Sequence, residues 1–141
     1  SYADYDDGWY VTNGGLGIAR SFTNNGDTVT DSVTGLEWQD NGAGGTPTWA
    51  NAGTYCENLT LGGQSDWRLP SIEELVTIAN KGAFNSSKFT EFQNVTSSGY
   101  WSATTNASIT SDAWNVYFLN GNDYWGYKTF FYYVLCVRGG Q

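Results

Sequence analysis

The sequence predicts an α+β domain in which strands come first, two helices follow, and strands return toward the C-terminal end. Apolar residues recur at every second position over residues 28–38 and again after residue 97, which is the period of a strand. Between these stretches, two segments carry apolar residues at offsets of three and four, which is the period of a helix. A length of 141 residues fits one domain over residues 1–141, because one hydrophobic core typically serves about 100 to 200 residues.

The first predicted element is a β-meander over residues 21–39. Asn25-Gly26 is a dipeptide typical of two-residue hairpin turns, and Thr34-Gly35 marks a second turn between alternating segments. Residues 1–20 hold acids and glycines with little periodicity, so we assign them only as a loose or edge-strand start. The regular part of the domain therefore begins near residue 21.

Two helices are predicted in the middle of the chain. Thr48 can cap a first helix over residues 49–59, and one face of that helix holds Trp49, Ala52, Cys56 and Leu59. Ser71 and Glu74 have the spacing of a capping box, which predicts a second helix from there to about residue 80. Its buried stripe should comprise Ile72, Leu75, Val76 and Ala79.

Period two returns over the last third of the chain. The alternation predicts that Trp114, Val116 and Phe118 point to the core, while the residues between them point to the other side. Asn120-Gly121 predicts the next turn. Residues 133–137 are expected to close the domain as a strand.

The chain has two cysteines, Cys56 and Cys136, and no histidine. One disulfide between them would close a loop of roughly 80 residues, which chain entropy values at about 4 to 5 kcal/mol. The alternative is two buried free thiols. The absence of histidine removes the commonest general base, the commonest zinc ligand and the Ser/His and Cys/His nucleophile pairs.

The formal net charge of −8 excludes several classes of partner. A chain this acidic repels phosphate backbones, sulfated sugars and anionic lipid, so we expect no nucleic-acid partner. The sequence also has no apolar run near the roughly 18 residues that a membrane span needs, and we expect no membrane insertion. A protein or a neutral glycan on a target surface is the expected partner.

Five short motifs in this order, together with the paired cysteines, resemble the Legionella collagen-like (Lcl) C-terminal domain family over about residues 21–141: Thr34-Gly-Leu-Glu-Trp38, Asp66-Trp-Arg-Leu-Pro70, Tyr100-Trp-Ser102, Ala113-Trp114 and Cys136-Val-Arg-Gly-Gly140. The resemblance implies a C-type lectin-like fold with two helices and antiparallel sheets, in which a cysteine on the first helix commonly bonds one on the last strand. The family is similar to two groups with this fold. These are the formylglycine-generating enzymes and the target-binding variable proteins of diversity-generating retroelements.

An enzyme of the formylglycine-generating kind needs a redox pair of cysteines or a copper site, and this chain offers only two cysteines. The carboxylates that could supply acid–base chemistry are not paired by spacing on one element; they are Glu73, Glu74, Glu91 and Asp123. We therefore predict no enzyme, no catalytic residue and no cofactor.

Calcium, which holds sugars in many C-type lectins, is a separate possibility. The oxygen-rich segments 24–27 and 120–123 are also ordinary turn sequences, and the Glu-Pro-Asn and Gln-Pro-Asp tripeptides of calcium-dependent lectins do not occur. We predict no metal site.

Aromatic residues make up 17% of the chain, more than a core of this size needs, so some rings should form a binding surface. The predicted ligand-binding residues lie between the framework positions of the C-terminal part: Asn106, Asn115, Tyr117, Leu119, Asn122, Tyr124, Trp125, Tyr127, Phe131 and Leu135. For Trp125 and Phe131 the alternative is that they pack inward. Leu135 stands where the Lcl family usually has arginine, as substitution at a variable site would produce.

These residues, with the resemblance, predict a non-enzymatic binding domain, the variable target-recognition module of a retroelement-diversified protein. Such a module would be extracellular, on a cell surface or on a virion. The alternative is a lectin-like adhesin domain that binds surface polysaccharide. The ligand and the oligomeric state stay open.

Overall fold

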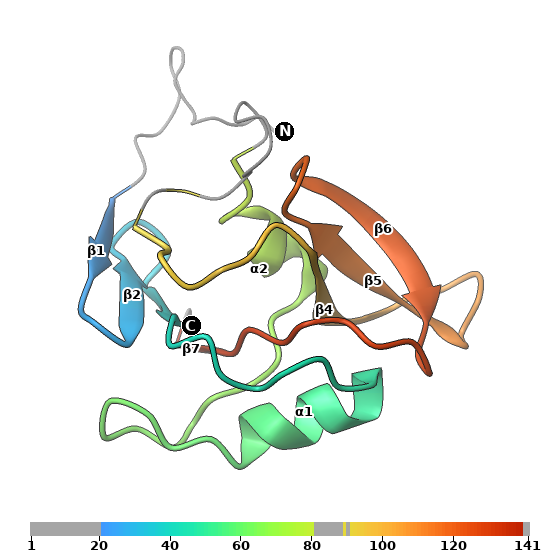
Figure 1. The fold of residues 1–141 in the computed structure, drawn as a ribbon, viewed down its shortest axis with the longest axis horizontal. Coiled ribbons are helices and arrows are strands. Elements are labelled where there is room, and N and C mark those ends of the chain that lie inside the picture. Colours follow the sequence, from blue (N-terminus) through green and yellow to red (C-terminus); the bar gives the residue numbers. More distant parts are fainter. Residues whose placement is uncertain (1–20, 81–88, 90, 140–141) are drawn as a thin grey trace.

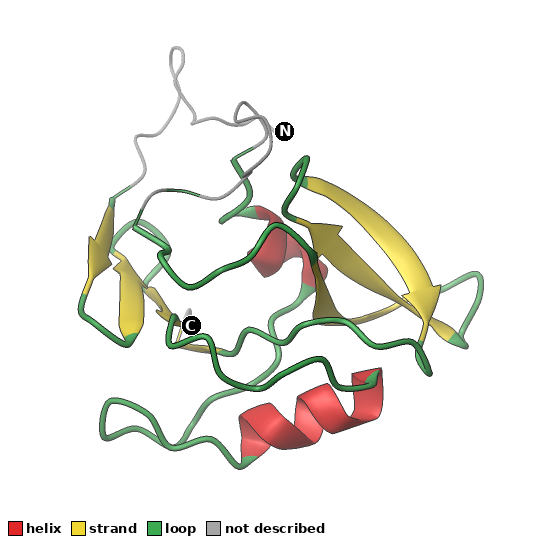
Figure 2. Ribbon diagram, in the orientation of Figure 1, coloured by secondary structure: helices red, strands yellow, loops and turns green. Residues whose placement is uncertain are grey.

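The computed structural model describes residues 21–80, 89 and 91–139, so the assignment made for residues 1–20 lies outside the described part. Strands and helices follow the predicted order (Figures 1 and 2). Their bounds are β1 Phe22–Asn24, β2 Thr28–Asp31, β3 Leu36–Gln39, α1 Trp49–Glu57, α2 Ile72–Val76, β4 Gly99–Thr105, β5 Asp112–Tyr117, β6 Asn122–Tyr127 and β7 Val137–Gly139. The α+β class is confirmed, and the arrangement is compatible with a C-type lectin-like fold.

The strands form two antiparallel sheets. One has the order β1-β2-β3-β7 and the other β4-β5-β6. In Figure 1 the four-stranded sheet lies on the left, the three-stranded sheet on the right and α2 between them, with α1 below. Because β7 pairs with β3, the end of the described chain returns to its first sheet.

The meander of β1, β2 and β3 has the two predicted turns. In the first hairpin, the amide of Asn25 donates to the carbonyl of Thr28 at 2.8 Å, so Gly26 and Asp27 form the turn. Gly26 has a φ of 99°, a conformation that glycine adopts without steric cost. The turn therefore lies one residue later than the Asn25-Gly26 dipeptide suggested.

The first helix agrees with its predicted face, since Ala52 and Cys56 are fully buried and Trp49 and Leu59 pack beside them. It ends at Glu57 rather than Leu59. Thr48 occupies the predicted N-cap position, but its side chain makes no capping hydrogen bond. The position is therefore confirmed and the side-chain cap is wrong.

The second helix begins with the predicted capping box. The Ser71 hydroxyl accepts from the amide of Glu74, and the Glu74 carboxylate accepts from the amide of Ser71. The helix ends at Val76, earlier than the predicted residue 80, because the following amides bond to the third residue back and form tight turns. These turns bury Ile78 fully, which the predicted stripe had missed.

The sequence predicts a closing strand over residues 133–137, but the regular strand begins only at Val137 and runs to Gly139. Tyr133 pairs with Tyr100 beside β4, whereas Val137 pairs with Trp38 of β3 and bridges to Arg68. The segment crosses from one sheet to the other and cannot stay in register with either. It links the two sheets instead.

Two hydrophobic clusters cover opposite faces of the three-stranded sheet. The first core cluster joins Val116 and Tyr100 to Leu75 of α2 and to the four-stranded sheet. The second core cluster joins Ala113 and Trp101 to α1 and the disulfide. The central strand β5 is therefore enclosed on both sides.

The predicted disulfide between Cys56 and Cys136 is confirmed, and no described cysteine is free. It ties α1 to the crossing segment, one residue before β7. Among the described residues, no helix has the length and hydrophobicity to cross a membrane.

Candidate functional site

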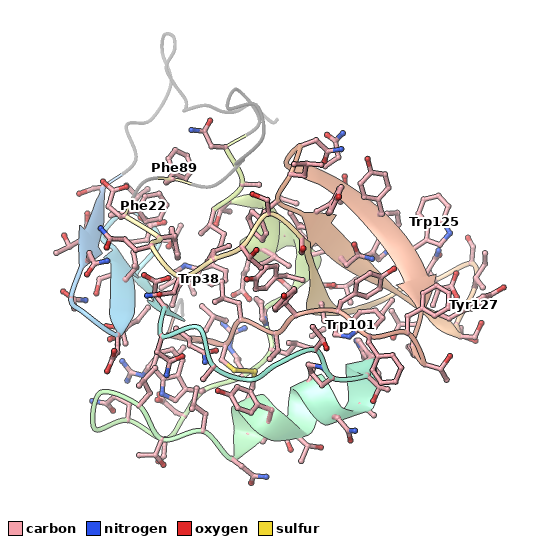
Figure 3. All side chains as sticks on the ribbon, viewed as in Figure 1. Phe22, Trp38, Phe89, Trp101, Trp125 and Tyr127 are labelled. Carbon is pink, nitrogen blue, oxygen red and sulfur yellow. A yellow bond between two sulfur atoms is a disulfide. The ribbon has the colours of Figure 1, made fainter. Side chains whose placement is uncertain are left out.

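Exposed aromatic rings gather on β6 and the loop that follows it. We call Tyr124, Trp125, Tyr127, Phe130 and Phe131 the aromatic surface; between 42% and 69% of each residue is exposed. Figure 3 shows Trp125 and Tyr127 projecting from the outer side of β6, while Trp101 lies nearer the centre of the molecule. The alternative in which Trp125 and Phe131 pack inward is wrong.

The aromatic surface wraps around the edge strand β6 rather than lying on one face. Trp114 of β5 and Trp125 are paired residues with ring centroids 5.2 Å apart. Tyr124 alternates to the other face, where its ring lies 6.3 Å from that of Tyr117. The interpretation that these aromatic residues share one binding face is therefore wrong, because Tyr124 lies on one side of the sheet and Trp125 and Tyr127 lie on the other. The edge of the sheet presents rings in two directions.

The loop after β6 is held against the body of the domain by backbone hydrogen bonds. The amide of Trp49 donates to the carbonyl of Lys128, and the amide of Tyr132 donates to the carbonyl of Pro47. Further along, Tyr133 exchanges hydrogen bonds with Gly99 and Trp101 of β4. Phe130 and Phe131 thus project from a loop that is fixed at both ends.

Tyr132 anchors this loop by packing onto the sheet. A Cβ at Gly99 or at Gly126 would lie 2.8 Å from the Tyr132 ring or hydroxyl, so both glycines leave the space that the ring fills. The ring also meets Trp101 edge-on with centroids 4.7 Å apart. Burial raises the pKa of the Tyr132 phenol.

Three predicted ligand-binding residues are buried instead of exposed. Asn115 is 3% exposed because it lies on the central strand, enclosed by both clusters. Asn106 is 8% exposed, and its Oδ1 accepts from the amide of Ser108 in the β4–β5 turn. Leu135 is 3% exposed and belongs to the first core cluster. These three residues do not form part of the surface.

The remaining predicted residues lie at the end of the β5–β6 hairpin. Asn122 is exposed, and its amide donates to Oδ1 of Asn120 in the turn. Leu119 and Tyr117 are half-buried. Sequence reasoning missed Phe130, which directly precedes the predicted Phe131 in the same loop.

The described cations are all engaged elsewhere. Arg68 forms a bidentate pair with Glu74, with N–O distances of 2.7 and 2.8 Å. Arg138 pairs with Glu37 and Asp66. Lys128 holds its ammonium group 4.2 Å from the ring centroid of Trp49. Within the described residues, Lys128 is therefore the one cation in the segment of the aromatic surface, and Asp123 adds a carboxylate to β6.

The oxygen-rich turns use their amide side chains to close the turn. Oδ1 of Asn24 accepts from the amide of Gly26 at 2.8 Å, and Oδ1 of Asn120 accepts from the amide of Asn122 at 2.9 Å. In the described ranges, no three His, Cys, Asp or Glu side chains gather in a way that could hold a metal ion. Ordinary turn chemistry accounts for both sequences.

A comparison with family models finds a match to the Lcl C-terminal domain over residues 27–138. No curated protein matches the chain. The matched range contains β2 to β6, the first two residues of β7, both helices, the disulfide and the aromatic surface. The chain therefore belongs to the Lcl C-terminal domain family.

Proposed function

We propose that this domain is a non-enzymatic target-recognition module that binds its partner through the aromatic surface. The observation that carries the proposal is the exposure of five large rings on one strand and a loop that is fixed at both ends. Exposed apolar rings in such number are uncommon on a soluble protein unless they bind something. Rings with few rotatable bonds also lose little conformational entropy on binding.

The partner that fits this surface is a protein or a neutral glycan. The described arginines are paired with carboxylates and Lys128 lies over an indole, so among the described residues a sulfated polysaccharide would meet a single lysine there and no cluster of cations. Aromatic rings can pack against apolar protein groups or stack on the C–H face of a sugar. A lectin-like adhesin for anionic polysaccharide is the less favoured alternative for this reason.

The absence of catalysis is part of the same proposal. The sequence has no histidine, and its two cysteines are joined in a disulfide. Glu74, one of the carboxylates with possible acid–base chemistry, is committed to Arg68 and to the capping box. These observations support a binding role over hydrolysis or thiol chemistry.

The finer proposal is that the domain is the variable module of a retroelement-diversified protein, displayed outside the cell or on a virion. A disulfide fits an oxidising compartment. The rings of β6 and its loop are exposed and lie outside both core clusters, as diversified positions require. Sequencing the gene neighbourhood tests this: a near-identical template copy that differs mainly at adenines is expected. A locus without such a copy or a reverse transcriptase would contradict it.

A binding screen tests the aromatic surface directly. The purified domain is applied to a glycan array and to a displayed surface proteome, together with a variant in which Trp125, Tyr127 and Phe131 are all changed to alanine. Binding should be lost in this variant while the melting temperature is kept, because these side chains are largely exposed.

Val33→Ala is the matched control, since Val33 is an exposed apolar residue on the β2–β3 turn. Its binding should equal that of the unmodified domain. A target that the triple variant still binds with full affinity would show that recognition occurs elsewhere on the domain.

A further inference from the structure

The strand β6 is an open edge of the three-stranded sheet (Figure 1). Its pairing with β5 runs from Asn122 to Tyr127 without a register shift. The strand contains neither proline nor lysine, which commonly keep other strands away from a sheet edge, and its one charged residue is Asp123. Within the described chain, β6 is therefore a regular strand with no strand on its outer side.

The other edges of the two sheets are short or covered. β1 and β7 have only three residues each, and Val137 of β7 also exchanges backbone hydrogen bonds with Arg68. On β4, the amide of Trp101 donates to the carbonyl of Tyr133. Two residues further along, an amide of β4 donates to the carbonyl of Pro70. Among the described strands, β6 alone presents a long edge that no segment covers.

The outward backbone groups of β6 can be assigned from the register of the β5–β6 pair. Asp112 opposes Tyr127, yet the amide and the carbonyl of Asp112 bond within the β4–β5 turn, so this pair exchanges no hydrogen bond. Antiparallel pairs alternate between bonded and non-bonded, so Asp123, Trp125 and Tyr127 turn their backbone groups outward. The carbonyl of Tyr127 accepts from the amide of Phe130. The amides of all three, and the carbonyls of Asp123 and Trp125, have no partner among the described residues.

This row of backbone groups matches the backbone of another extended chain. Its donors and acceptors recur every two residues, about 6.8 Å apart, which is the repeat of a second strand. In strand addition, backbone hydrogen bonds supply affinity and the side chains beside them supply specificity. Trp125 and Tyr127 flank the row on one face and Tyr124 on the other, so an added strand would contact rings on both of its faces. One occupant would thus use rings that point in two directions.

The charges near β6 favour a basic segment. Asp123 is exposed on the same face as Trp125 and forms no ion pair with a described cation. Lys128, which follows the strand, holds its ammonium group 4.2 Å from the ring centroid of Trp49 instead. A Lys or Arg side chain on an added strand can pair with the Asp123 carboxylate and lie over the exposed indole. A second copy of the domain would instead bring two net charges of −8 together.

We infer that β6 binds an extended polypeptide segment of the partner as an added strand, with a Lys or Arg side chain of that segment beside Asp123 and Trp125. This inference rests on the proposed function, because it names the class of partner that meets the aromatic surface. It selects a protein over a glycan, since a glycan has no backbone amides and carbonyls that could continue the ladder.

Hydrogen exchange followed by NMR tests the open edge on the unmodified domain alone. The amides of Asp123, Trp125 and Tyr127 should exchange much faster than those of Tyr124 and Gly126, which face β5. Slow exchange of both sets would show that another part of the chain covers the edge, and would overturn the inference. Protection that appears only at raised protein concentration would also overturn it, because a second copy would then be the occupant.

A library of random linear peptides displayed on phage supplies the probe for binding. Selection on the unmodified domain should enrich peptides that contain Lys or Arg, with β-branched or aromatic residues at alternate positions. The most enriched sequence, added as a synthetic peptide, should slow hydrogen exchange at the amides of Asp123 and Trp125. No enriched peptide, or a bound peptide that leaves these two amides unprotected, would count against strand addition.

Asp123→Pro removes one outward amide and places a proline ring against the added strand, while the bonds to β5 and all the rings stay. The selected peptide should bind this variant about tenfold or more weakly. Asp123→Asn is the matched control, because it removes only the charge, and its affinity should lie between those of the unmodified domain and the proline variant. Equal affinities of the two variants would overturn strand addition. Slow exchange at Tyr124 and Gly126 reports that the proline variant keeps its sheet.

The triple alanine variant of Trp125, Tyr127 and Phe131 separates this inference from the proposed function. If it still binds the peptide while Asp123→Pro does not, strand addition holds and recognition through the rings fails. If Asp123→Pro binds fully and the triple variant does not, the aromatic surface holds and strand addition fails.

Discussion

Asn115 shows how one side chain can be polar and yet enclosed. Its Nδ2 is buried without a hydrogen-bond partner, and it lies on a strand whose two faces are both covered. A buried donor without a hydrogen-bond partner costs about 1 to 3 kcal/mol of folding free energy, whereas an apolar group of the same shape carries no such cost. The residue therefore weakens the fold at this position.

Replacing Asn115 by leucine, which has a similar shape, should leave the free energy of unfolding unchanged or raise it by up to about 1 kcal/mol. Asn106→Leu is the matched control, because Asn106 Oδ1 does accept a hydrogen bond, from Ser108. The free energy of unfolding of this control variant should fall by about 1 kcal/mol. Urea unfolding of both variants measures the difference, and a larger loss at Asn115 than at Asn106 would contradict this account.

The two helix starts differ in chemistry although both have a hydroxyl at the N-cap. Ser71 accepts a hydrogen bond from the amide of Glu74, whereas Thr48 makes no side-chain cap. Ser71→Ala should therefore lower the free energy of unfolding by about 1 kcal/mol. Thr48→Ala should leave it nearly unchanged. Equal losses in thermal unfolding of the two variants would show that the capping geometry does not distinguish them.

The disulfide acts on the whole molecule, because it joins residues 80 apart in the sequence. Reducing it should lower the free energy of unfolding by about 4 to 5 kcal/mol, since the unfolded chain regains the entropy of an open loop. Thermal unfolding with and without reductant measures this loss. Alkylation without reductant should leave the intact mass unchanged, and two added alkyl groups would refute the bond.

Acid should also weaken the whole molecule through its ion pairs. The hydrogen bonds from Arg68 hold the pKa of Glu74 below its ordinary 4.5. A folded-state pKa that is lowered gives stability that is full above the unfolded-state value and is lost as the pH falls through the folded-state value.

Glu74→Gln, which keeps the capping-box spacing, should therefore show a shallower fall in melting temperature below about pH 5 than the unmodified domain. The matched variant Glu73→Gln, next to it on the exposed side of α2, should keep the original slope. Identical slopes for all three proteins would show that the Arg68–Glu74 pair contributes no acid sensitivity.

The sequence by itself determined the α+β class, the order of the elements and the capping box at Ser71. These follow from local periodicity and turn chemistry, which act over a few residues. For the two cysteines it left a disulfide and two free thiols as alternatives, and the structure shows the disulfide. The exposure of Trp125 and Phe131 was left open by the same reasoning, since an aromatic residue suits a core and a surface equally well.

Only the tertiary structure decided which rings are exposed and which polar residues are enclosed. Alternation along β5 could not show that both of its faces are covered, because α1 and α2 come from far earlier in the chain and pack on opposite sides. The same holds for Leu135, which lies on a segment that crosses between the sheets. Burial depends on long-range packing. The sequence could therefore name candidate surface residues, but only the tertiary structure shows which of them are exposed.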